Sequence, residues 1–370
     1  MRKIGILFIT MIAFISCDSS DDSSDNGNQN NFDRSGMMTN IADNLIIPAF
    51  TDLNNDLATL ENEIASFSTS PDLAGLNATR TAWLNAYTTW QYVEMYNIGK
   101  AEEVQLAFKM NVYPTNVTDI QNNILDGNAD LNAVNNNDAV GFPAVEYMIY
   151  GTGNDDQEII DFYTTDSNAS LNKQYLIDLS AAMKSLTQEV LDDWNNGFRD
   201  SFVNSTENTA TSALNRLVND YIFYYEKGLR ANKIGIPAGI FSSSSLPDRV
   251  EGLYSEVYSK QLATTALNAV RQFFTGQHYN SSTTGLSLSD YVTASETDAN
   301  NSLSTEISNQ FETAQNQLST LDANLSSQVN TNNTAMLQTY DELQRAVVLL
   351  KVDMLQLLNI NVDYVDADGD

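Results

Sequence analysis

The stretch that decides the fold lies near the C-terminus and reads Tyr340-Asp-Glu-Leu-Gln-Arg-Ala-Val-Val-Leu-Leu-Lys-Val-Asp-Met-Leu-Gln-Leu357. Its apolar residues recur every seven positions in two interleaved series, Tyr340, Val347, Met354 and Leu343, Leu350, Leu357. Apolar residues at this spacing form one face of an α-helix that packs against other helices. We therefore expect this segment to face the core of a helical bundle.

Helical periodicity continues over the chain from about Ser35 onward, and no stretch alternates with period two between turn signals. The sequence therefore predicts an all-α protein. The expected helices lie at about 36–64, 71–97, 116–126, 143–150, 168–196, 248–275, 297–322 and 331–359, with one more around Leu214. Two aromatic stripes, Trp83-Tyr87-Trp90 and Leu214-Leu217-Tyr221-Tyr224, either pack in the core or line a ligand pocket.

The chain has 370 residues, which exceeds the usual size of a single hydrophobic core. The polar stretch from Asp200 to Asn208 separates two sets of helices. We predict two tandem four-helix-bundle-like domains, at 35–203 and 204–370. The short similarity between Gly141-Phe-Pro-Ala144 and Gly235-Ile-Pro-Ala238 indicates a relation by duplication.

The composition excludes several classes of function. The chain has 18 Lys and Arg residues and 48 Asp and Glu residues. The resulting net charge of −30 repels nucleic acid. One cysteine and one histidine leave no internal disulfide and no histidine-built zinc site. His278 falls in a polar loop, and the chain holds no HExxH motif and no nucleotide-binding loop.

The N-terminus resembles a bacterial lipoprotein signal peptide over residues 1–16. Arg2 and Lys3 precede the apolar run Ile4–Ile15, and Cys17 follows as the predicted lipid acceptor; ordinary secretion with a free cysteine is the alternative. Residues 17–34 read as a flexible acidic tether, either a spacer or an export tag. We expect an exported protein, lipid-anchored to the bacterial outer membrane on its periplasmic or cell-surface face.

The segment Gly141-Phe-Pro-Ala-Val-Glu146-Tyr147 has the features of the start of a short helix. Gly141 permits an unusual backbone angle, and Pro143 suits a first helical turn. Glu146 would lie in the first turns beside aromatic residues, where burial costs a carboxylate its hydration. It is either a surface acid that stabilises the helix start or part of a site.

This segment resembles the signature Gly-x-His-x-x-Glu of the imelysin-like family, also called insulin-cleaving membrane protease or iron-regulated protein A-like. Gly141 and Glu146 match the signature, and the resemblance covers most of residues 36–370. The other matching blocks are Arg80-Thr-Ala-Trp83 with Trp90 and Glu94, Lys233–Gly239, Glu251–Ser259, Gly285–Tyr291, Leu349–Met354 and Asp366–Asp370.

The resemblance implies a two-domain helical protein of the cell envelope, linked to iron uptake, with its site in the crevice between the domains. The residues that would form the site are Arg80, Trp83, Glu94, Gly141, Pro143, Glu146, Tyr147 and Lys233. Pro143 replaces the signature histidine and supplies neither a lone pair nor a proton. A two-ligand His–Glu metal site is therefore lost, and Glu146 alone stays a candidate metal ligand.

Three functions follow as hypotheses. The first is a binding protein for iron, another hard cation or an iron-bearing species, with an envelope transport protein as partner. The second is a metal-dependent peptidase with Glu146 as its general base, and the third is a non-catalytic surface interaction protein. No resident cofactor is predicted; Asp366-x-Asp368-Gly-Asp370 is only part of a calcium loop, because the chain ends there.

Overall fold

The computed structural model describes residues 32–297 and 302–363. The described residues from Phe32 onward belong to one compact unit. The predicted signal peptide at 1–16, the lipid acceptor Cys17, most of the predicted tether and the acidic ending Asp366–Asp370 lie outside the described residues. These expectations stay predictions.

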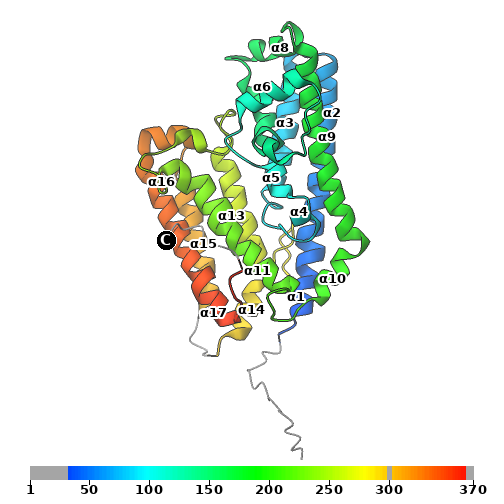
Figure 1. Ribbon diagram of the computed structural model, residues 1–370. Coiled ribbons are helices and arrows are strands. Elements are labelled where there is room, and N and C mark those ends of the chain that lie inside the picture. The colour runs from blue at the N-terminus through cyan, green and yellow to red at the C-terminus, as the bar shows by residue number, and fades with distance from the viewer. Residues whose placement is uncertain (1–31, 298–301, 364–370) are drawn as a thin grey trace, which may run out of the picture. The chain divides into compact units, whose positions relative to one another are not determined.

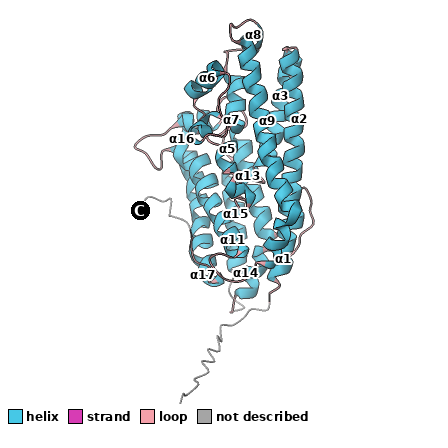
Figure 2. Ribbon diagram, turned by 45° about the vertical axis from the view of Figure 1, so that its right-hand side comes forward, coloured by secondary structure: helices cyan, strands magenta, loops and turns pink. Residues whose placement is uncertain are grey.

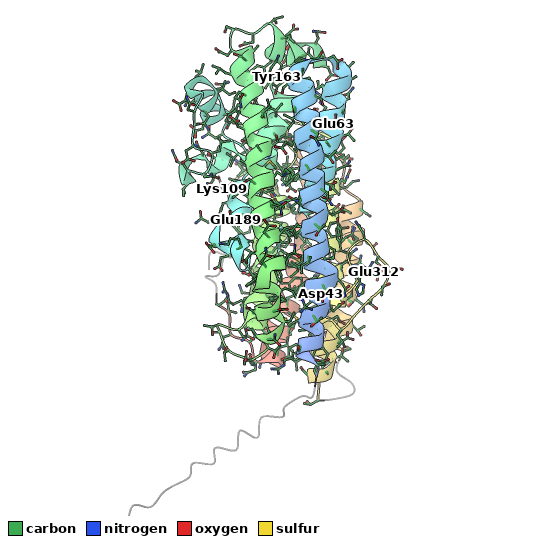
Figure 3. All side chains as sticks on the ribbon, turned by 90° about the vertical axis from the view of Figure 1, so that its right-hand side faces the viewer. Asp43, Glu63, Lys109, Tyr163, Glu189 and Glu312 are labelled. Atoms are coloured by element: carbon green, nitrogen blue, oxygen red, sulfur yellow. The ribbon has the colours of Figure 1, made fainter. Side chains whose placement is uncertain are left out.

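Ten helices form the first half of the described chain, which we call the N-terminal helices (Figure 1). The long helix α2 packs against α3 and α9, and Figure 3 shows α2 and α9 side by side. The bounds are α1 (Arg34–Ile41), α2 (Ile47–Thr69), α3 (Leu73–Trp90), α4 (Lys100–Glu103), α5 (Leu106–Met110), α6 (Val117–Asp126), α7 (Gly141–Glu146), α8 (Asp156–Thr164), α9 (Ala169–Asp193) and α10 (Arg199–Asn204), with π-helical or 3₁₀ segments η1 (Ala42–Ile46), η2 (Val134–Ala139), η3 (Tyr147–Gly151) and η4 (Trp194–Phe198).

The remaining helices, which we call the C-terminal helices, lie beside the N-terminal helices (Figure 2). Helix α16 contacts α15 and the π-helical segment η5, and α13 contacts α15. The bounds are α11 (Ala213–Phe223), α12 (Ile236–Ala238), α13 (Ser259–Thr275), α14 (Leu288–Ser295), α15 (Leu303–Ser319), α16 (Leu325–Val348) and α17 (Leu355–Leu358), with η5 (Tyr224–Gly235), η6 (Pro247–Arg249) and η7 (Leu349–Met354).

The predicted all-α fold class is confirmed. Among the described residues the only β feature is one isolated bridge between Gln277 and Thr284. Within that same part of the chain, no helix is long and apolar enough to span a membrane. The domain boundary near residue 203 and the relation by duplication stay predictions.

The heptad stretch packs as its pattern predicts. Leu343, Leu350 and Met354 are fully buried, because they lie on the face of α16 and η7 that meets the neighbouring helices. The aromatic stripe of α3 is likewise core, with Trp83 and Tyr87 fully buried. Burial of large apolar side chains such as these supplies most of the driving force for the fold.

The predicted helix at 248–275 is wrong over its first third. Helix α13 begins only at Ser259, and residues 250–258 form a loop of turns and bends, which we call the 250–258 loop. Gly252 and Glu256 adopt positive φ angles of 71° and 60°, which an α-helix does not accommodate. The expected helix at 71–97 also ends early, at Trp90. Residues 91–97 and 250–258 were predicted to be helical and are not, and both segments contain polar residues of the candidate site.

Candidate functional site

The N-terminal helices meet the C-terminal helices at a group of polar side chains that is largely withdrawn from solvent. Hydrogen bonds, ion pairs or mutual electrostatic influence connect its members. We call this group the seam cluster; its members are Gln91, Glu94 and Asn111 from the N-terminal side and Tyr224, Lys233 and Glu251 from the C-terminal side.

Lys233 lies between two carboxylates of the seam cluster. Its Nζ is 2.7 Å from Glu251 Oε2 and 3.5 Å from Glu94 Oε2. The side chains of Lys233 and Glu251 are each 2% exposed, and that of Glu94 is 13% exposed. The three charged side chains form an ion triad that joins the two sets of helices. Of the three, only the side chain of Glu94 is partly exposed to solvent.

Two amide side chains hold the carboxylates in place. Asn111 Nδ2 donates to Glu94 Oε1 and to Glu251 Oε1, each at 2.8 Å, and Gln91 Nε2 donates to Glu251 Oε1 at 3.2 Å. The Tyr87 hydroxyl in turn donates to Asn111 Oδ1 at 2.6 Å. These bonds fix the orientation of both carboxylates before any ligand arrives.

One buried oxygen atom of the seam cluster, Gln91 Oε1, has no hydrogen-bond partner within the described part of the chain. Glu94 Oε2 lies 3.5 Å from the ammonium of Lys233, and the Glu94 carboxylate accepts a hydrogen bond from the hydroxyl of Tyr224. Burial raises the pKa of Glu94, whereas the nearby ammonium of Lys233 and the Asn111 amide lower it. Buried polar atoms are nearly always paired, so the unpaired oxygen of Gln91 indicates a place for a ligand or ordered water.

Glu146 lies beside the seam cluster and ties the two sets of helices together. It ends α7, is 2% exposed, and its Oε1 accepts a hydrogen bond of 2.8 Å from the backbone N–H of Ser255 in the 250–258 loop. Burial raises the pKa of Glu146 to about 7, the hydrogen bonds from Ser255 oppose that rise, and Glu251 adds to it. Glu146 thus anchors the loop that carries Glu251.

The local sequence explains how α7 reaches this position. Gly141 has a φ of +75°, and a Cβ there would lie 2.2 Å from the carbonyl oxygen of Met110. Pro143 is buried in the first turn of α7, and Trp83 Nε1 donates to the carbonyl of Phe142 at 3.1 Å. The Gly-x-Pro segment therefore starts the helix directly against the backbone of α5.

We expect Gly141→Ala to lower the free energy of unfolding by more than about 3 kcal/mol, since steric overlap adds to the cost of about 1–3 kcal/mol for a strained φ. Gly127→Ala is the matched control. Gly127 also has a positive φ, +68°, but a Cβ there would meet only Leu171 Cδ2, at 3.5 Å. Urea denaturation of both variants measures the difference, and equal losses would contradict the close approach.

The remaining predicted site residues make their contacts outside the seam cluster. Arg80 donates to Asp156 Oδ1 at 2.8 Å and to the carbonyl of Ile149 at 3.0 Å, and its guanidinium lies 4.3 Å from the ring centre of Tyr150. The ring of Tyr147 meets that of Tyr254 edge-on at 5.2 Å. The structure thus brings Glu94 and Lys233 into one cluster with Glu146 beside it, and engages Arg80, Trp83 and Tyr147 in other contacts.

Sequence reasoning did not single out Gln91, Asn111 or Glu251 as site residues, and it placed Tyr224 in an aromatic stripe. The signal for Glu251 was its position between Val250 and the Gly252-Leu253 pair, where an acid is unusual unless it is paired. Among residues 32–297 and 302–363, no three His, Cys, Asp or Glu side chains converge as a metal-binding group. The seam cluster instead combines two carboxylates with phenol and amide oxygens.

Comparison with known proteins identifies the family to which the chain belongs. The family model described as imelysin, which carries a peptidase label, matches residues 46–352. The chain therefore belongs to the imelysin family, as the signature resemblance predicts.

Solved structures share the fold at low sequence identity. An imelysin-like protein from Psychrobacter arcticum 273-4 aligns with a TM-score of 0.70 and 16% identity over 90% of this chain and 97% of its own. A protein from Parabacteroides distasonis ATCC 8503, named as an iron-regulated protein A precursor, aligns with a TM-score of 0.68 and 16% identity over 87% and 95%. No curated protein matches the sequence.

Proposed function

We propose that this chain is a non-catalytic binding protein of the bacterial cell envelope, anchored through a lipid on Cys17, that takes up an iron-bearing species at the seam cluster. The observation that carries the proposal is the convergence of the two largely buried carboxylates of Glu94 and Glu251 beside the unpaired amide oxygen of Gln91. Hard cations such as ferric iron prefer oxygen ligands, and this set needs no histidine. The name of the Parabacteroides structure, an iron-regulated protein A precursor, agrees with an iron-linked role.

The donor set fits a hard cation under one condition. Lys233 holds its ammonium 2.7 Å from one carboxylate and 3.5 Å from the other, so an arriving cation competes with it. The partial exposure of Glu94 gives the ammonium a direction in which to withdraw. In this proposal Glu94 and Glu251 hold the ligand, Gln91 and Asn111 orient them, and Glu146 keeps the 250–258 loop in place.

Proteolysis is not part of the proposal. Pro143 stands where the family signature has histidine, and the carboxylate of Glu146 already accepts the N–H of Ser255. A hydrolytic reaction needs a base that is free to take a proton from water. Cleavage of a denatured protein substrate by the metal-loaded mature protein, absent in Glu146→Ala, would contradict this part of the proposal.

We expect the mature, metal-stripped protein to bind iron from ferric nitrilotriacetate in a calorimeter, and Glu94→Gln to weaken that binding by about 10- to 100-fold. The substitution keeps the size of the side chain but removes the charge and one acceptor oxygen. Glu207→Gln removes an equal charge from an exposed position and serves as the control. Absence of binding by the unmodified protein, or equal affinities for all three proteins, would overturn the proposed function.

A further inference from the structure

We propose that a second cavity, formed where α10 of the N-terminal helices meets the start of α11, binds a small aromatic monocarboxylate whose ring enters the cavity and whose carboxylate pairs with Arg216. We call it the α10–α11 cavity. It has a volume of about 170 Å³ and is lined by residues from 98–99, 198–205 and 211–216. Among the described residues that line it, none belongs to the seam cluster, so this inference goes beyond the proposed function and does not depend on it.

The apolar wall of the α10–α11 cavity has the size of a single aromatic ring. Ile98, Phe198 and Phe202 form this wall, and the ring centres of the two phenylalanines lie 6.3 Å apart. Trp194 packs edge-on against both rings, at 4.8 Å and 5.1 Å. An apolar cavity of about 150 Å³ is large enough to bind benzene. The α10–α11 cavity therefore accommodates one ring together with its first substituent.

Gly99 allows the ring of Phe198 to take its place in this wall. Gly99 has a φ of +60°, and a Cβ at this position would lie 2.5 Å from Cζ of the Phe198 ring. Any larger residue would therefore displace the ring. Phe202 is buried, at 1% exposure. The apolar wall is thus formed by closely packed side chains and keeps its shape before a ligand arrives.

The polar lining of the α10–α11 cavity offers hydrogen-bond donors. It includes the guanidinium of Arg216 and the hydroxyls of Ser205 and Thr211. Ser205 Oγ accepts the backbone N–H of Ala213 at 2.9 Å, which leaves the hydroxyl hydrogen for a ligand. Among the described residues that line the cavity there is no Asp or Glu, although the chain has 48 of them. Such a lining favours a ligand that carries an anionic acceptor group.

Arg216 can accept a second carboxylate. It pairs with Glu102 through Nη2 alone, and the two side chains are 42% and 51% exposed. An ion pair exposed to this extent contributes little to stability, so a ligand can share the guanidinium or replace Glu102 at small cost. The planar guanidinium presents parallel N–H groups that match the two oxygens of a carboxylate.

The other charges near Arg216 select a ligand with one negative charge. Burial raises the pKa values of Asp220 and Asp363, and the guanidinium of Arg216 opposes both shifts. Together with Glu102, these acids place three carboxyl groups near a single guanidinium. A ligand with a second negative charge is therefore repelled, because like charges at short range disfavour each other.

Titration of the mature protein with benzoate tests the proposal, followed by calorimetry and by tryptophan fluorescence. We expect a dissociation constant of about 1 mM or below and a fluorescence change that Trp194→Phe removes. Arg216→Met should weaken binding by about 10- to 100-fold. Ser201→Leu enlarges an exposed side chain that lines the cavity and should abolish binding. Arg271→Met removes an equal charge on α13, outside the cavity, and should keep the affinity.

The chemical class of the ligand is tested with three analogues. Acetate lacks the ring, benzamide lacks the charge, and phthalate carries a second carboxylate. Each should bind at least about 10-fold more weakly than benzoate. Absence of benzoate binding, equal affinities for the unmodified protein and Arg216→Met, or an analogue that binds as tightly as benzoate would overturn this inference. None of these outcomes would affect the proposed binding of iron at the seam cluster.

Discussion

Lys233→Met should destabilise the protein by about 3–5 kcal/mol, because it leaves two buried carboxylates without their cation. Lys233 is 2% exposed and makes its ion pairs with Glu251 at 2.7 Å and with Glu94 at 3.5 Å. Methionine fills a similar volume, so the loss arises from charge and not from a cavity. The carboxylates come from opposite sides of the seam, and their repulsion then acts to separate the two sets of helices.

Urea denaturation at pH 7 measures this loss, with Lys184→Met as the control. Lys184 lies half-buried on α9, and its substitution should change stability by no more than about 0.5 kcal/mol. The cost in Lys233→Met should shrink as the pH falls, since Lys233 lowers the pKa of Glu94 and its removal makes that carboxyl easier to protonate. A loss below about 1 kcal/mol would show that solvent already screens the triad.

In the Lys233→Met variant ferric iron no longer competes with an ammonium group for the two carboxylates. Ferric nitrilotriacetate should therefore raise the stability of the variant more than that of the unmodified protein, since binding to the folded state alone stabilises it. The same two carboxylates then explain both the destabilisation without metal and the rescue with metal.

The fold was predictable from the sequence because its signal is local and repeated. The heptad of Leu343 and Leu350 and the stripe of Trp83 and Tyr87 each fix a buried helical face, and the structure buries all four. The ends of helices depend on single backbone angles. Glu256 has a φ of 60°, although it is not a glycine. Nothing in its sequence context predicts this angle, and the helix predicted from residue 248 therefore begins only at Ser259.

The candidate site was predictable only in part. The resemblance to the imelysin family pointed to Glu94, Glu146 and Lys233, and these lie close together at the seam. Their partners Asn111 and Glu251 lie on separate segments that follow helix breaks, where no periodic pattern indicates which side chains converge. The unpaired state of the Gln91 amide oxygen is a property of three-dimensional packing and leaves no trace in the sequence.

Glu146→Gln should make the protein more stable above pH 7, by up to about 3 kcal/mol, because burial raises the pKa of Glu146 from 4.5 to about 7. Between these values the folded protein binds a proton that the unfolded chain has released. The free energy of unfolding therefore falls as the pH rises from about 4.5 to 7, and the full cost is present above 7. Glutamine carries no charge, and its Oε1 can still accept the N–H of Ser255.

Urea denaturation of both proteins from pH 4.5 to 8 measures the effect, and the two curves should meet near pH 4.5. Glu94 and Asp220 also have raised pKa values, but they contribute equally to both proteins and cancel in the difference. Glu312→Gln, an exposed carboxylate on α15 labelled in Figure 3, should run parallel to the unmodified protein. A difference between Glu146→Gln and the unmodified protein that does not change with pH would mean that Glu146 titrates as an exposed acid.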